Sequence, residues 1–113
     1  MINVKDLYDK VNSVVGISQK DFISSFNEAV LQLLTRYGEK YVFENTAPLD
    51  IESVDDTSDI YAEWRAPILN YVIYQKSGDQ LRRQEYDTAL DYAYRTVWRQ
   101  KLKKKRFKTN SWI

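Results

Sequence analysis

Carboxylates are densest in the segment Asp50-Ile-Glu-Ser-Val-Asp-Asp-Thr-Ser-Asp59, and calcium and magnesium bind such oxygen ligands. The segment does not match a calcium-binding loop. Counted from Asp50, the sixth position is Asp55 where that loop requires glycine, and the twelfth is Tyr61 where it requires glutamate. We therefore expect no metal site. Two interpretations remain: a solvated loop whose acids cap a helix, or a surface that contacts basic side chains. The predicted subunit-contact residues are Asp50, Glu52, Asp55, Asp56 and Asp59.

Cysteine and histidine are both absent from the chain. Their absence excludes disulfides, thiolate zinc sites, cysteine nucleophiles, and the serine–histidine and cysteine–histidine catalytic pairs. The sequence also lacks a glycine-rich phosphate loop, paired carboxylates in a catalytic arrangement, and a nucleophile beside a base. We therefore expect no enzyme activity and no cofactor, and expect a protein that acts by contacting other macromolecules.

The second distinctive segment is basic: Arg99-Gln-Lys-Leu-Lys-Lys-Lys-Arg-Phe-Lys108. Residues 99–113, which we call the C-terminal arm, carry 7 bases and no acid, whereas residues 1–98 carry all 16 acids and 10 bases. Such segregation usually means that the two ends of the chain contact different surfaces, or that the end of one copy contacts the middle of another copy.

Three interpretations of the arm stay open. They are a solvated helix end favoured by the helix dipole, salt-sensitive binding of phosphates, and docking onto an acidic protein partner. We favour docking, because Phe107, Trp112 and Ile113 would give the arm apolar anchors that phosphate binding does not need. The predicted partner-binding residues are Arg99, Lys101, Lys103, Lys104, Lys105, Arg106, Phe107, Lys108 and Trp112.

The chain of 113 residues lies within the usual range of a single domain. No stretch approaches the roughly 20 apolar residues that cross a bilayer, and the first sixteen residues do not resemble a signal peptide. We therefore expect a soluble, non-secreted chain with one helical-bundle domain over residues 1–105 and a tail over residues 106–113.

Two early helices are well signalled. Asn3 is a good cap for the first, which Gly16 ends, and Ser18 is a good cap for the second. The second helix is expected from about residue 19 to 37, because its apolar residues recur at the helical period and Gly38 suits a helix end. Its apolar stripe consists of Phe22, Phe26, Ala29, Val30, Leu33, Leu34 and Tyr37.

The periodicity lapses from Glu39 to about Thr57, which predicts an irregular acidic loop. A third helix is expected to begin between Asp56 and Asp59 and to run to Lys76, with a kink or break just before Pro67. The residues expected to face inward are Ile60, Trp64, Ile68, Leu69, Val72 and Ile73, whereas Tyr61, Tyr71, Tyr74 and Tyr92 are expected to be less committed to the core.

The fourth helix is expected to be the longest, from about Asp79 to Lys104. Residues 107–113 carry no helix signal. The predicted fold is therefore all-α: a small bundle of about four helices with a long C-terminal helix, an irregular acidic loop between helices 2 and 3, and an extended basic C-terminal tail. The apolar stripe of the fourth helix is Tyr86, Ala89, Leu90, Ala93, Tyr94, Val97, Trp98 and Leu102.

Two stretches carry a resemblance to a known family. They are Phe22-x3-Phe26-Asn-Glu-Ala29-x3-Leu33-x3-Tyr37, and Ile68-Leu-x-Tyr71-x2-Tyr74-Gln-Lys-x-Gly-Asp79 followed by Tyr86-x2-Ala89-x2-Tyr92. In pattern and order over most of residues 18–105, the chain resembles the head-tail connector (adaptor, or head-completion) proteins of tailed bacteriophages. In that family an early helix, an irregular stretch and a helical hairpin lead into an extended C-terminal tail.

The resemblance implies a structural virion protein of the neck, at the head-tail interface, made in the cytoplasm of the host bacterium. It implies a ring of identical subunits, commonly a dodecamer, that joins the portal protein to a tail or stopper protein and lines part of the DNA passage. Family members often place a C-terminal segment against the portal, which corresponds here to Arg99–Ile113. The basic character of that segment is not part of the resemblance, so contact with DNA stays a second possibility.

The alternative function is that of a small phage-encoded nucleic-acid-binding helical protein acting through its basic C-terminal arm. A helix-turn-helix protein presents a basic recognition helix after a compact turn. Here the second expected helix is nearly neutral and the third is interrupted by Pro67. We therefore favour docking between proteins in a ring, without a membrane partner.

Overall fold

A computed structural model describes residues 1–45 and 50–110, with side chains given as far as Lys103. Over these residues the chain is mostly helical, with five α-helices, one short 3-10 helix and no β-strand. The prediction of an all-α fold is confirmed at this level. The helix count exceeds the expected four because the single-turn helix α3 (Glu39–Val42) forms where a loop was expected.

Helices α1 (Val4–Val15) and α2 (Gln19–Tyr37) begin where their caps predict. The side chains of Asn3 and Ser18 each accept a hydrogen bond from the N–H group three residues later, at 3.0 and 3.1 Å. Such bonds satisfy first-turn donors that have no partner inside the helix. Helix α2 ends at Gly38, whose φ of +87° is in the region that glycine adopts readily.

The chain after α3 returns to the body through a few backbone contacts. Phe43 and Ile60 form an isolated antiparallel bridge, and the Glu44 N–H donates to the Asp59 carbonyl at 2.8 Å. Residues 50–59, which we call the acidic loop, contain no helix or strand. Its closing end is therefore fixed against the segment that follows α3.

The third predicted helix begins later than expected. A 3-10 turn (Ala62–Trp64) leads into α4 (Arg65–Ser77), so the expected start between Asp56 and Asp59 is wrong. Pro67 is the third residue of α4, where a missing N–H costs nothing because first-turn N–H groups have no partner within the helix. Proline therefore lies in the first turn of α4, and the change from the 3-10 turn to the α-helix between Trp64 and Arg65 falls where a break was expected.

Helix α5 (Gln80–Asn110) has 31 residues and is about 46 Å long. Its predicted end at Lys104 is too early, and residues 106–110 are helical where an extended tail was expected. Lysine and arginine are good helix formers, and bases near a helix C-terminus interact favourably with its dipole. The run of bases therefore continues the helix, while residues 111–113 lie outside the described part of the chain.

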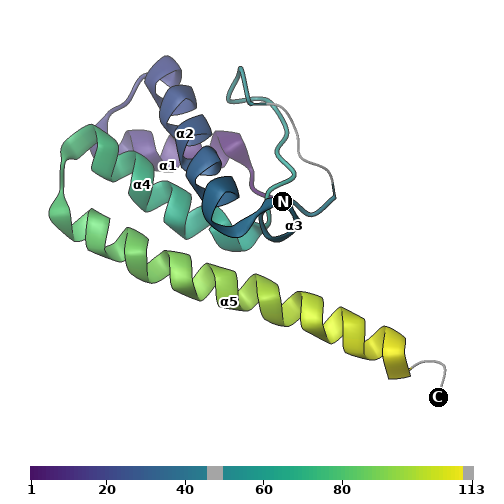
Figure 1. Cartoon of the computed structure of the whole chain (residues 1–113). Helices are drawn as coiled ribbons and strands as arrows, with labels where there is room; N and C mark the ends of the chain where they lie inside the picture. Colours follow the sequence, from purple (N-terminus) through teal and green to yellow (C-terminus); the bar gives the residue numbers. More distant parts are fainter. Residues whose placement is uncertain (46–49, 111–113) are drawn as a thin grey trace.

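Helix α4 is the central element and packs against α1, α2 and α5. Figure 1 shows α4 and α5 as an antiparallel hairpin, with α2 crossing above α4 and the C-terminal end of α5 extending beyond the rest of the molecule. The molecule is consequently elongated, with extents of 55 × 28 × 23 Å.

The core combines residues from all the longer helices with several from the loop. Trp64, Ile68 and Val72 are fully buried, as predicted. Tyr61 and Tyr71 are also buried, so the expectation that they are less committed to the core is wrong for these two residues. The Tyr71 hydroxyl accepts a hydrogen bond from Gln32 Nε2 at 3.0 Å, which allows a polar tip to be buried. Tyr74 is half-buried, and Tyr92 is exposed.

Candidate protein-contact surfaces

The C-terminal arm begins on a part of α5 that still contacts the body. Among the residues of α5 with described side chains, Val97 is the last that is fully buried. Three residues later, Gln100 Nε2 donates a hydrogen bond to Glu63 Oε1 at 2.8 Å. Lys101 and Leu102 are half-buried, and Lys103 is exposed. The backbone of α5 continues as helix for about two further turns, from Lys103 to Asn110.

A shallow hollow lies at the base of the arm. It is lined by Lys40, Tyr41, Trp98, Lys101 and Leu102, and its volume is about 220 Å³. The Lys101 ammonium lies 5.4 Å from the centre of the Tyr61 ring and 5.9 Å from that of Tyr41. Such cation–π contacts orient a lysine without neutralising its charge. The hollow therefore combines an apolar surface with the ammonium groups of two lysines.

Aromatic contacts tie this hollow to the core. The Tyr37 ring lies 5.0 Å from that of Trp64 and stacks on that of Tyr94 at 4.8 Å, and Tyr41 meets Tyr94 edge-on at 5.4 Å. Trp64 Nε1 donates a hydrogen bond to the Tyr41 carbonyl at 2.8 Å. Burial raises the pKa of the Tyr37 hydroxyl above its ordinary value. Tyr41, which lines the hollow, is thus held by contacts with Tyr94 and Trp64.

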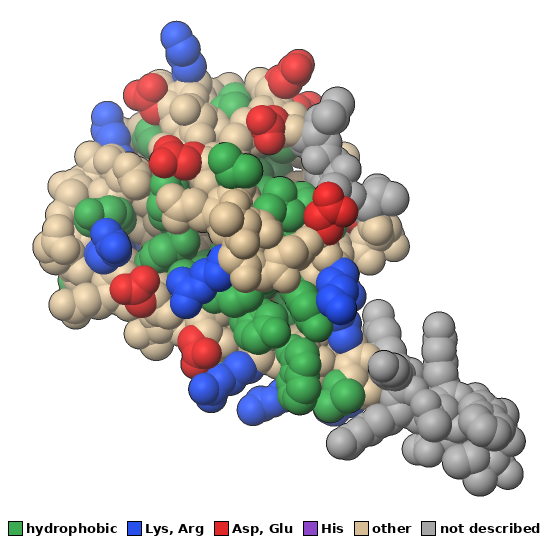
Figure 2. All heavy atoms as spheres, in the orientation of Figure 1, with side chains coloured by type: hydrophobic (Ala, Val, Ile, Leu, Met, Phe, Trp, Pro, Cys, Tyr) green, Lys and Arg blue, Asp and Glu red, His purple; other side chains and the backbone are tan. Residues whose placement is uncertain are grey.

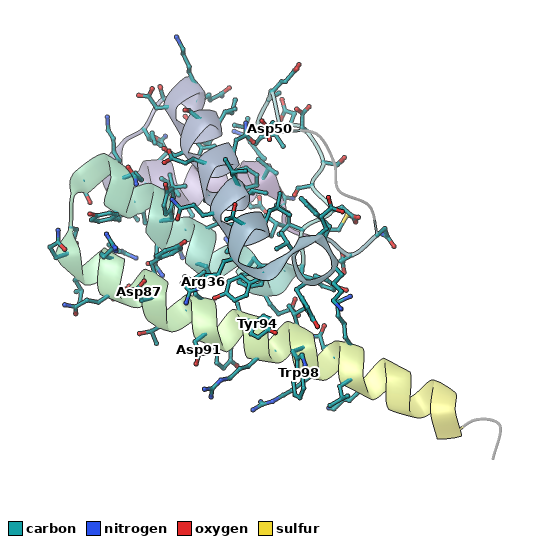
Figure 3. All side chains as sticks on the ribbon, in the orientation of Figure 1. Arg36, Asp50, Asp87, Asp91, Tyr94 and Trp98 are labelled. Atoms are coloured by element: carbon teal, nitrogen blue, oxygen red, sulfur yellow. The ribbon has the colours of Figure 1, made fainter. Side chains whose placement is uncertain are left out.

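Trp98 departs from the sequence prediction. Its expected place was the buried stripe of the fourth helix, but 44% of it is exposed. Trp98 lies one turn beyond Tyr94 on α5 (Figure 3), where the helix has begun to leave the body. Figure 2 shows apolar side chains flanked by basic ones on this part of the surface, next to the end of α5. Exposed tryptophan is common at the centre of protein interfaces.

The predicted arm residues fall into two groups. Arg99 and Lys103 are exposed, and Lys101 is half-buried against the tyrosine rings. The side chains of the remaining predicted residues, together with Trp112, lie outside the described part of the structure. The backbone shows that five of these follow on helix α5: Lys104, Lys105, Arg106, Phe107 and Lys108.

The acidic loop uses two of its five predicted carboxylates to hold its own shape. Asp56 Oδ2 accepts hydrogen bonds from the N–H groups of Glu52 and Ser53, at 2.8 and 3.0 Å. The Asp59 carboxylate accepts two from Asn45, one from its backbone N–H and one from its side-chain amide, at 2.8 and 3.2 Å. The structure therefore gives Asp56 and Asp59 local roles in the loop.

The other three predicted carboxylates, Asp50, Glu52 and Asp55, have exposed side chains. Among the residues whose side chains are described, acidic side chains do not gather in a group of three or more that could hold a metal ion. Exposed carboxylates on a fixed loop can still attract basic side chains of another chain.

The acidic loop is fastened to α2. The Asn27 side chain donates to the Ile51 carbonyl at 3.0 Å and accepts from the Ile51 N–H at 3.1 Å. Ile51 and Val54 are buried in the core cluster. Between the loop and α2 lies a narrow apolar groove with a volume of about 50 Å³, whose lining includes Leu31 and Asp50.

Leu31, which lines this groove, was not among the contact residues predicted from the sequence. It lies next to the predicted apolar stripe of α2, yet 62% of it is exposed. A leucine one position outside the buried stripe is a signal in the sequence, but exposed leucines are common and do not by themselves identify a site.

The arm and the acidic loop do not lie together. Figure 1 shows the loop beside α2 in the upper right of the view and the end of α5 leaving the body at the lower right, and Figure 3 places Asp50 and Trp98 well apart on the body. The fold and these surfaces define a mostly helical protein that presents a basic, partly aromatic helix end and an acidic loop at separate places.

No protein-family model, curated protein or solved structure matches the chain. Across the described ranges, none of the helices has both the length and the apolar character needed to span a bilayer.

Proposed function

We propose that the chain is a structural subunit of a bacteriophage head-tail connector, which assembles into a ring that joins the portal protein to a tail or stopper protein. The observation that supports this most is the continuation of α5 to Asn110 through the basic segment, with Arg99 and Lys103 exposed on its surface. A projecting helix of one charge and a fixed loop of the other, placed apart on one chain, suit contacts between separate proteins.

The chemistry of the surface favours a contact role over catalysis. The hollow beside the arm offers aromatic rings, a leucine and two lysines. Aromatic residues are the side chains that contribute most to protein interfaces, whereas charged residues beside them give orientation and speed of association. In this proposal the chain is not an enzyme, resides in the neck of the virion, and lines part of the DNA passage.

Assembly of the purified chain with a portal ring tests this function. Native mass spectrometry and negative-stain imaging, with and without the portal, should show rings of the chain or rings added to the portal. A chain that stays monomeric and never joins a purified neck complex would contradict the proposal.

Charge reversal in the arm makes the test specific. Lys103→Glu, Lys104→Glu and Lys105→Glu together should block assembly and leave the monomer folded, because Lys103 is exposed and all three residues follow Leu102 near the end of α5. The matched control reverses three other lysines with exposed side chains, Lys10, Lys20 and Lys76. Normal assembly of the arm variant would count against docking through the arm.

The alternative is nucleic-acid binding, and the continuous basic helix at the end of α5 is the observation that favours it. Neutralising phosphates releases counterions, so affinity for DNA would fall steeply with salt. Titration with duplex DNA at two salt concentrations separates the two functions. Absence of salt-dependent binding would eliminate the alternative, while strong binding without any portal interaction would favour it.

A further inference from the structure

The base of the arm has the composition of a helix that docks into a groove. Trp98 is 44% exposed, and Leu102, one turn later on the same side of α5, is half-buried. Arg99 and Lys103, each one position further along, are both exposed. The last part of α5 with described side chains therefore presents two apolar residues bordered by two cations.

The groove between α2 and the acidic loop has the opposite charge and a similar apolar character. Its lining is formed mainly by buried apolar side chains, with Leu31 exposed beside them and Asp50 at its edge. The groove itself is too small for a large side chain, so a partner would cover Leu31 and the groove mouth without inserting deeply. Glu52 and Asp55 are exposed in the same loop.

We propose that the Trp98–Lys103 turn of one copy docks on the groove at Leu31 and Asp50 of a second copy. Trp98 and Leu102 cover Leu31, and Arg99 and Lys103 face Asp50 and the exposed acids of the loop. This inference rests on the proposed function, because it assigns the contact between neighbouring subunits of the ring.

Charge complementarity identifies the second copy as the partner. Residues 99–113 carry 7 bases and no acid, and the acidic loop carries five acids and no base. Trp98 and Asp50 lie well apart on the body, so a single chain cannot join its own two surfaces (Figure 3). A contact between two different surfaces is head-to-tail, and such contacts close into a ring when the rotation between copies permits.

Two charge-altered chains test this contact directly. The arm variant carries Arg99→Glu and Lys103→Glu, and the groove variant carries Leu31→Lys and Asp50→Lys. In each variant the side chains placed opposite one another at the Leu31 and Asp50 groove carry like charge, so self-association measured by sedimentation equilibrium should weaken by about tenfold or more. Every substituted side chain is exposed, and circular dichroism with thermal unfolding verifies that both variants fold.

Mixing the two variants provides the decisive measurement. In the mixture, the unchanged arm of the groove variant can bind the unchanged groove of the arm variant. A 1:1 mixture should therefore associate, although neither variant associates alone. A single chain carrying all four substitutions should also regain association, since both charges are exchanged. The control, Lys10→Glu with Lys20→Glu, alters two other exposed lysines and should behave as wild type.

The outcomes separate this inference from the proposed function. If wild type and both variants form the same rings, or if folded variants fail to associate on mixing, the arm–groove contact is wrong while the connector function stands. If the arm variant loses only portal or DNA binding and still self-associates, the arm serves another partner and the contact is likewise overturned. A wild-type chain that remains monomeric up to about 1 mM, with or without portal, contradicts both.

Discussion

The acidic loop and the basic arm are both charged segments outside the regular packing of the bundle, yet the fold treats them differently. The loop is fixed at several points: by buried Ile51 and Val54, by the Asn27 side chain, by the Asp56 carboxylate that accepts from the loop's own backbone, and by the Asp59 carboxylate that accepts from Asn45. The arm continues α5 after half-buried Lys101 and Leu102. Asp56 therefore stabilises the loop itself, whereas Arg99 and Lys103 of the arm are exposed at the surface.

The largest expected effect comes from removing an apolar anchor of the loop. Ile60, at the end of the loop, is 1% exposed and forms the bridge with Phe43. Ile60→Ala should lower the free energy of unfolding by about 2–5 kcal/mol, because it removes buried methylenes and leaves a cavity. Denaturant unfolding measures this loss. The control Leu31→Ala, at an exposed position, should change stability far less, and equal losses would mean that the loop is not anchored as described.

A smaller loss is expected when the polar link between α2 and the loop is cut. Asn27→Ala removes two hydrogen bonds to Ile51 and should cost about 1–3 kcal/mol. Asn27→Asp keeps an acceptor for the Ile51 N–H but loses the donor, so its loss should be intermediate. Hydrogen exchange at the Ile51 amide reports the same link, and unchanged protection in Asn27→Ala would show that the loop holds without it.

Within the loop, two neighbouring carboxylates should behave differently. Asp56→Ala removes the acceptor of two backbone N–H groups and should cost about 1 kcal/mol. Asp55→Ala removes an exposed side chain and should change stability by no more than about 0.5 kcal/mol. Thermal unfolding of the two variants side by side gives the comparison. Similar losses at both positions would mean that the Asp56 hydrogen bonds do not organise the loop.

The sequence was sufficient for the parts of the fold that local rules determine. Asn3 and Ser18 cap their helices as predicted, and the stripe from Phe22 to Leu33 is buried. The sequence-based prediction was wrong where tertiary packing determined the boundary of a helix. The start of α4 depended on Ile60 pairing with Phe43, a contact 17 positions away in the chain, and not on helical periodicity.

The surfaces were harder to predict than the helices. Charge segregation located both the arm and the loop, but it did not separate Asp56, which bonds its own loop, from exposed Asp55. Periodicity also placed Trp98 in the core, whereas 44% of it is exposed next to fully buried Val97. The whole fold determines which turns of a long helix pack against a neighbour. These turns therefore cannot be predicted from a local sequence pattern.

The smallest effect on stability is expected from the arm itself. Ending the chain after Lys103 removes residues beyond the last described contacts of α5 with the body, so the free energy of unfolding should change by less than about 0.5 kcal/mol. The same truncation removes four bases and should abolish docking to the portal. Unfolding and portal binding are measured on one preparation, with the full chain beside it. A stability loss above about 1 kcal/mol would show that the arm packs on its own body, and the distinction between a fixed loop and a projecting arm would then fail.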